Sequence, residues 1–132
     1  MEVRTPYAFG KIVASPFSVT EKRVREELQK EGFGILSEID VTAKFREKLG
    51  KEFRNYVILG ACNPAMAWEA FERELNIGTL LPCNVVVYDV VERGTAVMVM
   101  DPVAALSLID NPDVTGIAVM VKEKLARVLA QL

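Results

Sequence analysis

The residues best suited to chemistry form two Cys-Asn dipeptides, Cys62-Asn63 and Cys83-Asn84. These are the only two cysteines of the chain, and it has no histidine. Two thiols that lie close together can bind a soft metal ion, form a reversible disulfide, or act as a nucleophile and a resolving thiol. Because histidine is absent, serine-histidine and cysteine-histidine catalysis are excluded. Any site in this chain must therefore work with thiols, amides and carboxylates.

Each of these four residues also has a structural interpretation. Cys62 precedes the predicted start of a helix, where the partial positive charge lowers the pKa of a thiol, but free cysteine is also among the most buried residue types. Asn63 is followed by proline, which is typical of a capped helix start. Asn84 begins a valine-rich strand, where asparagine is poorly suited and should be hydrogen-bonded if buried. Its side chain either ties down the turn at Asn63-Pro64 or contacts a ligand. A metal at Cys62 and Cys83 needs carboxylates, water or a second subunit's thiols, because two cysteines do not complete a zinc site.

Two carboxylates form a further candidate. Glu38 and Asp40 lie two residues apart on a predicted strand, which places both on one face with their carboxylates roughly 7 Å apart. Such a pair can bind a cation or serve in acid-base chemistry. The alternative is that Asp40 caps the helix that follows while Glu38 is solvated. The basic residues within 44–54 attract an anionic ligand or form a solvated helix face.

Composition limits the class of protein. A chain of 132 residues is the length of one domain, which we expect to span residues 1–132. Because 51% of the residues are hydrophobic, we expect both a dense core and a homodimer interface. The net charge of −2 comes without a basic stripe, so nucleic acid is not an expected partner. No apolar run is long enough for a membrane span and no secretory signal is evident, so we expect a cytoplasmic protein with reduced thiols.

The hydrophobic pattern predicts an α+β fold. Strands are expected at residues 7–14, 35–41, 55–62, 83–91 and 95–100, the last two joined as a hairpin. Helices are expected after a capping box at Ser18 and Glu21, at 41–49, after Asn63, after Asp101 and after Asn111. The order predicts a largely antiparallel, curved sheet with helices packed on one face and a long C-terminal helix.

Three helices carry apolar positions that predict their packing. In the helix after the capping box, Val24 and Leu28 are expected to face inward. In the helix after Asn63, Trp68, Phe71 and Leu75 are expected to be buried. The last helix carries a continuous seam of six apolar residues, Val114, Ile117, Val121, Leu125, Val128 and Leu132.

Three segments resemble the bacterial and archaeal family called domain of unknown function 302. The matching segments are Gly34-Ile35-Leu36-Ser37-Glu38-Ile39-Asp40-Val41, Tyr56-Val57-Ile58-Leu59-Gly60-Ala61-Cys62-Asn63-Pro64 and Ile77-Gly78-Thr79-Leu80-Leu81-Pro82-Cys83-Asn84-Val85. The resemblance implies an α+β fold of the TATA-binding-protein-like class, with a curved sheet and a long C-terminal helix. It implies no activity.

These observations leave three hypotheses for function. In the first, the protein is a homodimeric module that binds or senses a small ligand or soft divalent metal at the Cys62/Cys83 end of the sheet. Asn63, Asn84 and Glu38 would supply polar contacts there. In the second, the protein is a thiol-dependent enzyme that uses Cys62. In the third, it is an interaction protein without a small ligand, in which the apolar seam of the last helix or the edge of the hairpin joins two subunits.

Overall fold

The protein folds around one six-stranded, fully antiparallel sheet, seen in a computed structural model that describes residues 1–132. The strand order in space is β1-β2-β6-β5-β4-β3. The strands are β1 (Glu2–Arg4), β2 (Ala8–Val13), β3 (Gly34–Asp40), β4 (Tyr56–Cys62), β5 (Cys83–Val90) and β6 (Gly94–Met100). The predicted α+β class and antiparallel sheet are confirmed. Strand β1 was not predicted, because three residues are too few to show an alternating pattern.

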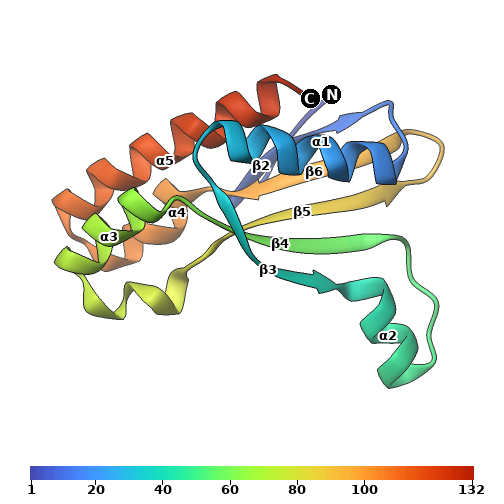
Figure 1. The fold of residues 1–132 in the computed structure, drawn as a ribbon, viewed down its shortest axis with the longest axis horizontal. Coiled ribbons are helices and arrows are strands. Elements are labelled where there is room, and N and C mark those ends of the chain that lie inside the picture. Colours follow the sequence, from blue (N-terminus) through green and yellow to red (C-terminus); the bar gives the residue numbers. More distant parts are fainter.

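The helices are α1 (Phe17–Lys30), α2 (Val41–Leu49), α3 (Pro64–Arg73), α4 (Pro102–Leu106) and α5 (Pro112–Ala130), with short 3-10 helices η1 (Leu75–Leu80) and η2 (Ser107–Ile109). Of these, α1 and α5 cover one face of the sheet, whereas α3 and α4 lie beyond one end of its strands (Figure 1). None of these helices combines the length and the apolar character that a membrane span requires. The long C-terminal helix predicted by the sequence is present as α5.

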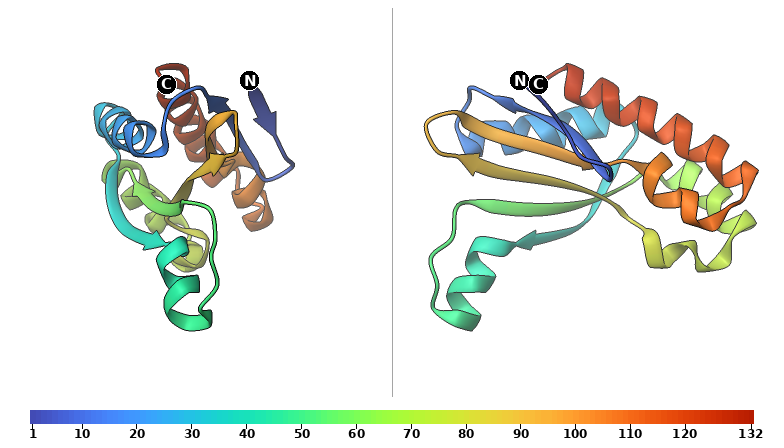
Figure 2. Two further views of the ribbon diagram at one scale, coloured as in Figure 1. Left: turned by 90° about the vertical axis from the view of Figure 1, so that its right-hand side faces the viewer. Right: turned by 180° about the vertical axis from the view of Figure 1, so that it is seen from behind.

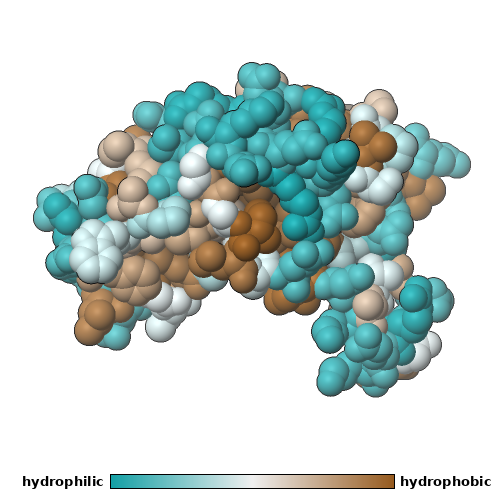
Figure 3. Space-filling model, viewed as in Figure 1, coloured by the Kyte–Doolittle hydropathy of each residue, from teal (hydrophilic) through white to brown (hydrophobic).

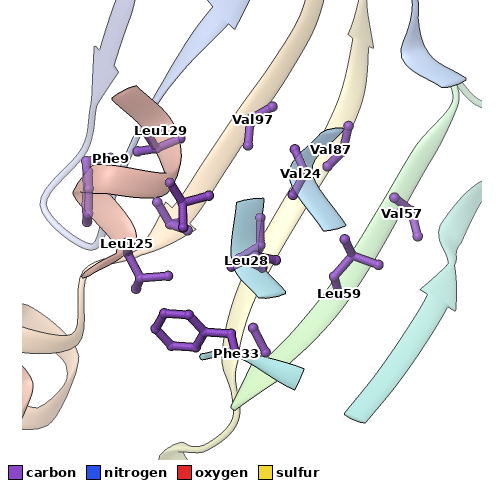
Figure 4. Packing of buried hydrophobic residues seen from close by; sticks show 14 residues of the cluster. Phe9, Val24, Leu28, Phe33, Val57, Leu59, Val87, Val97, Leu125 and Leu129 are labelled. Atoms are coloured by element: carbon purple, nitrogen blue, oxygen red, sulfur yellow. The ribbon is translucent and has the colours of Figure 1, made fainter. Parts of the chain in front are cut away.

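The main core lies between α1, α5 and the sheet (Figure 4). Val24 and Leu28 of α1, both predicted to face inward, are completely buried there. They meet strand residues such as Leu59, Val87 and Val97. A smaller cluster around Ile77, Leu106 and Val114 holds α3, η1, α4 and α5 together. Burial of these side chains provides the main stabilisation of the fold.

Helix α2 departs from the predicted arrangement of helices on one face. It extends to the side of the sheet away from α1 and α5 (Figure 2). No residue of α2 is buried, and every residue from 44 to 55 is exposed. We call residues 41–55 the arm. Phe45, Leu49 and Phe53 of the arm remain 38%, 61% and 42% exposed.

Two further predictions about helices, the cap at Ser18 and the buried stripe of α3, were wrong. Ser18 does not cap α1, because the helix already begins at Phe17, directly after Pro16. Trp68 and Leu75 are 69% and 81% exposed, because α3 ends at Arg73 and buries Ala70 instead. Phe71, the third residue of that predicted stripe, is also exposed, at 40%.

The surfaces expected to join two subunits are used within the chain. The seam of α5 faces its own core, where Val114, Leu125 and Val128 are at most 2% exposed. The hairpin of β5 and β6 occupies the centre of the sheet and has no free edge. Neither surface is available for the pairing that the third hypothesis assigned to it.

Candidate functional site

The two faces of the sheet differ in charge. The register places all six charged strand residues on the helix-covered side, which also holds the core: Glu2, Arg4, Lys11, Glu38, Asp40 and Asp89. The other face, which we call the open face, has no charged strand residue, although the guanidinium of Arg54, from outside the strands, lies 6.0 Å from the centre of the Tyr88 ring on this face. The residues of the open face include Val3, Ala8, Gly10, Ile12, Ser37, Ile39, Tyr56, Ile58, Gly60, Asn84, Val86, Tyr88, Val90, Gly94, Ala96, Met98 and Met100. A solvated face of an antiparallel sheet usually carries polar residues, so this face has the composition of a covered surface.

The open face contains a groove of about 370 Å³, which is larger than hollows of about 230, 220 and 40 Å³ elsewhere in the molecule. Val86 and Met98 line it at the centre of the sheet, and Val3 and Met100 line it towards β1. We call this hollow the open-face groove. Figure 3 is viewed from the side on which α1 lies; it shows apolar side chains gathered below α1 and the lobe formed by α2 standing off from the rest of the molecule.

Polar groups in the open-face groove are few. Asn84, the only side-chain amide on this face, is exposed and makes no hydrogen bond within the chain. The rings of Tyr56 and Tyr88 stack with their centroids 5.2 Å apart. The pKa of Tyr56 is raised above its ordinary value of 10.0, mainly by burial and to a smaller extent by the neighbouring Tyr88. Its hydroxyl therefore stays protonated at neutral pH. The groove therefore combines an apolar wall with one amide and four hydroxyls, those of Thr5, Tyr7, Tyr56 and Tyr88.

Cys62, Asn63 and Cys83 line a different and smaller hollow, which we call the thiol hollow. It lies between the ends of β4 and β5 and the helices α3 and α5, where Met66 and Ile117 also line it. The register pairs Ala61 with Cys83, which brings the ends of the two strands together as predicted. Its volume is only about 40 Å³, and its lining is almost entirely apolar.

Both thiols are held in their protonated form. Burial raises the pKa of Cys62, so the expected lowering by the start of α3 does not prevail. Burial, and then the neighbouring Cys62, raises the pKa of Cys83 to about 11. A thiolate is both the nucleophile and the metal ligand, so these surroundings disfavour either role at neutral pH. No group of three or more histidine, cysteine or acidic residues lies close enough together to hold a metal ion.

Asn63 has the structural role that its sequence predicts. Its side chain accepts a hydrogen bond of 3.4 Å from the backbone N–H of Met66 and so caps α3. Its amide nitrogen donates to the carbonyl of Glu31 at the end of α1, also at 3.4 Å. Gly32 makes this contact possible, because its φ is +85° and a Cβ there would lie 3.1 Å from the Asn63 amide. The residue thus ties two helix ends together beside the thiol hollow.

Glu38 and Asp40 share one strand face as predicted but have separate partners. Glu38 forms a 2.8 Å ion pair with Arg25 of α1. Asp40 accepts a hydrogen bond of 2.9 Å from the N–H of Ala43 and caps α2. Both line a polar hollow of about 220 Å³ beside α1. The six candidate residues therefore divide among three places, and Asn84 does not tie down the turn at Asn63.

The whole chain can now be compared with known proteins. A family model described as "Domain of unknown function DUF302" matches residues 9–132. This chain belongs to that family. A solved structure described as uncharacterized conserved protein DUF302 from Bacillus stearothermophilus is similar over its length, with a TM-score of 0.87 and 32% identity. The similarity covers 94% of this chain and 96% of the other. No curated protein matches the chain.

Sequence reasoning missed the open-face groove, although a signal was present. In β5 and β6, both alternating sets of side chains are apolar, with Val86 and Met98 on the face without helices and Val85 and Val97 on the other. When helices cover only one face of an antiparallel sheet, the side chains on the other face should be mostly polar. Two apolar sets indicate that both faces of a strand are covered.

Proposed function

We propose that this member of the family is a binding module for a small, mainly apolar organic molecule, held in the open-face groove. The observation that carries the proposal is the volume of the groove together with its lining. About 370 Å³ lies within the range of roughly 300 to 1,000 Å³ that is typical of small-molecule sites. Such sites are mostly apolar, with a few polar groups that orient the ligand.

Asn84 is the residue to which we assign that orienting role. Its amide offers one acceptor and two donor hydrogens, none of them engaged within the chain. The stacked rings of Tyr56 and Tyr88 add flat apolar surface next to it. A planar ligand with one hydrogen-bonding group matches this combination.

The thiol hollow is a smaller candidate for the same kind of function. Cys62, Asn63 and Cys83 line it together, which supports the predicted site at this end of the sheet. A volume of about 40 Å³, however, holds only a few water molecules or one small group. The raised pKa values of its thiols also weigh against a thiol-dependent enzyme. The role of Glu38 and Asp40 as ligand contacts stays a prediction. The cytoplasmic location, expected for a protein with two free thiols, also stays a prediction.

A fluorescence titration with 1-aminoanthracene, a planar apolar probe that carries one amine, tests the proposal. We expect saturable binding at one site per chain. Val86→Lys should weaken it at least tenfold by placing a charge in the groove, and Asn84→Leu should weaken it roughly fivefold through the loss of one hydrogen bond. Leu75→Lys is the matched control, since Leu75 is 81% exposed and lies outside the groove.

The titration has a clear contradicting outcome. If the probe does not saturate, or if Val86→Lys and Leu75→Lys change its affinity equally, the groove is not the binding site. Far-UV circular dichroism of each variant shows whether it has kept its fold.

A further inference from the structure

We infer that a second copy of this chain covers the open face, and that the arm of each copy packs over the open face of the other. One part of this inference rests on the proposed function: the ligand groove would lie between the two copies. The dimer itself is argued from other observations. It starts from two unpartnered apolar features on one molecule, the open face and the arm. A two-fold axis covers both features on both copies at once.

The open face is suited to contact with its own copy because none of its strand residues is charged. The guanidinium of Arg54, which belongs to the arm, lies 6.0 Å from the centre of the Tyr88 ring on this face. Two identical surfaces that carry like charges repel one another when a two-fold axis brings them together. Here no charge of the sheet needs to be desolvated on that face. Ile39, near its edge, is 45% exposed in the single chain. Covering such side chains provides the hydrophobic driving force for association.

A row of aromatic rings makes the arm continuous with the open face. Phe45 lies edge-on to Phe53 at 5.1 Å, and Phe53 lies 6.0 Å from Tyr56. Tyr56 in turn stacks on Tyr88 at the centre of the sheet. The arm therefore stands on the side of the open face, as the views of α2 also indicate (Figure 2). Two of its charged pairs, Lys44–Glu47 and Arg46–Glu52, are satisfied within the arm itself.

The area of these surfaces agrees with a dimer that uses both. Six strands spaced about 4.8 Å apart and about 20 Å long present a face of roughly 500 Å². A standard interface buries about 800 Å² on each partner. The sheet face alone falls short of that value, and the exposed apolar side of the arm supplies the remainder.

The edges of the sheet are less suited to joining two copies. The edge strand β1 has only three residues. The other edge strand, β3, has an irregularity between Ile35 and Ser37 and carries Glu38 and Asp40. Short strands, bulges and charges are features that prevent pairing between edges. Contact between open faces therefore explains the exposed apolar surface better than a sheet continued across two chains.

Sedimentation equilibrium of the full chain tests this inference. We expect the wild-type protein at micromolar concentration to show twice the chain mass of 14.6 kDa. Ile39→Lys on the open face and Leu49→Lys on the arm should each raise the dissociation constant at least tenfold. Leu108→Lys is the control, since Leu108 is 81% exposed and lies in η2, outside the open face and the arm. All three sites are exposed, so the variants should fold.

A monomeric wild-type protein would overturn the inference. So would a dimer or larger assembly whose mass is unaffected by both Ile39→Lys and Leu49→Lys, because another surface would then join the copies. Titration of the wild-type protein with 1-aminoanthracene, beside its sedimentation equilibrium, separates the two proposals. If the wild-type protein is a monomer and binds the probe, the proposed function stands and the dimer is refuted. If it is a dimer and binds no probe, the dimer stands and the proposed function is refuted.

Discussion

At the scale of single residues, local surroundings decide which of the candidate groups can react. Cys62 and Cys83 are the only thiols, yet both lie against apolar side chains that disfavour the charged form. Asn84 has the opposite setting, because it is exposed on an apolar face and free of partners within the chain. The residue that appeared least explained by the sequence thus becomes the candidate for ligand contact, while the more reactive residue types are enclosed.

The raised pKa of Cys83 predicts a loss of stability in alkaline solution. The thiol titrates near pH 9.0 in the unfolded chain and at about 11 in the folded protein, so folding favours its protonated form. The stabilisation is complete below pH 9 and is lost as the pH rises through 11, by on the order of 2 to 3 kcal/mol. Urea unfolding between pH 8 and 11 should therefore show a steeper loss for wild type than for Cys83→Ala. Parallel pH profiles for the two proteins would contradict the assignment.

At the scale of elements, capping residues determine where the helices begin and how they are joined. Asp40, Asn63, Asp101 and Asn111 each accept hydrogen bonds from the first turn of the helix that follows. Three of these helices have proline at the first position, which has no N–H to satisfy. Ser18 did not act in this way, because Pro16 had already started its helix. Proline therefore marked these helix starts more reliably than serine.

Removal of the cap at Asn63 should destabilise the fold through α3 and its link to α1. Asn63→Ala is expected to lower the free energy of unfolding by about 1 to 2 kcal/mol, because both hydrogen bonds of the side chain are lost. Asn63→Asp keeps the acceptor for Met66 but loses the donor to Glu31, so its loss should be smaller. Urea unfolding of the three proteins at pH 7 measures the difference. Equal losses for both variants would show that the cap itself contributes little.

At the scale of the whole molecule, a main cluster of buried residues lies between the sheet and the helices α1 and α5, and a second cluster joins α3, η1, α4 and α5. The opposite face of the sheet is apolar. The main cluster stabilises the fold. The open face does not contribute to that core, and its partly exposed apolar side chains make it the surface that we propose for recognition. The arm stands on the same side and contacts the rest of its own chain mainly through β4.

This division predicts where substitutions are costly. Leu28 is completely buried and Leu75 is 81% exposed, although the sequence predicted both to be inside. Leu28→Ala should lower the free energy of unfolding by about 2 to 5 kcal/mol, because it leaves a cavity in the main core. Leu75→Ala should change it by no more than about 0.5 kcal/mol. Chemical denaturation of both variants checks the assignment, and a large loss for Leu75→Ala would place that residue in a contact between molecules.

The sequence by itself determined the α+β class, most of the strands and four of the helix caps, including Asn63 and Asp40. These features depend on residues that are neighbours in the chain, so a local pattern contains the information. Only the tertiary structure decided that Asn84 lies apart from Cys62 and Cys83, that the seam of α5 faces its own core, and that one face of the sheet has no charged strand residue. The physical reason is that register and strand order depend on contacts between distant segments, which alternation within a single strand does not reveal.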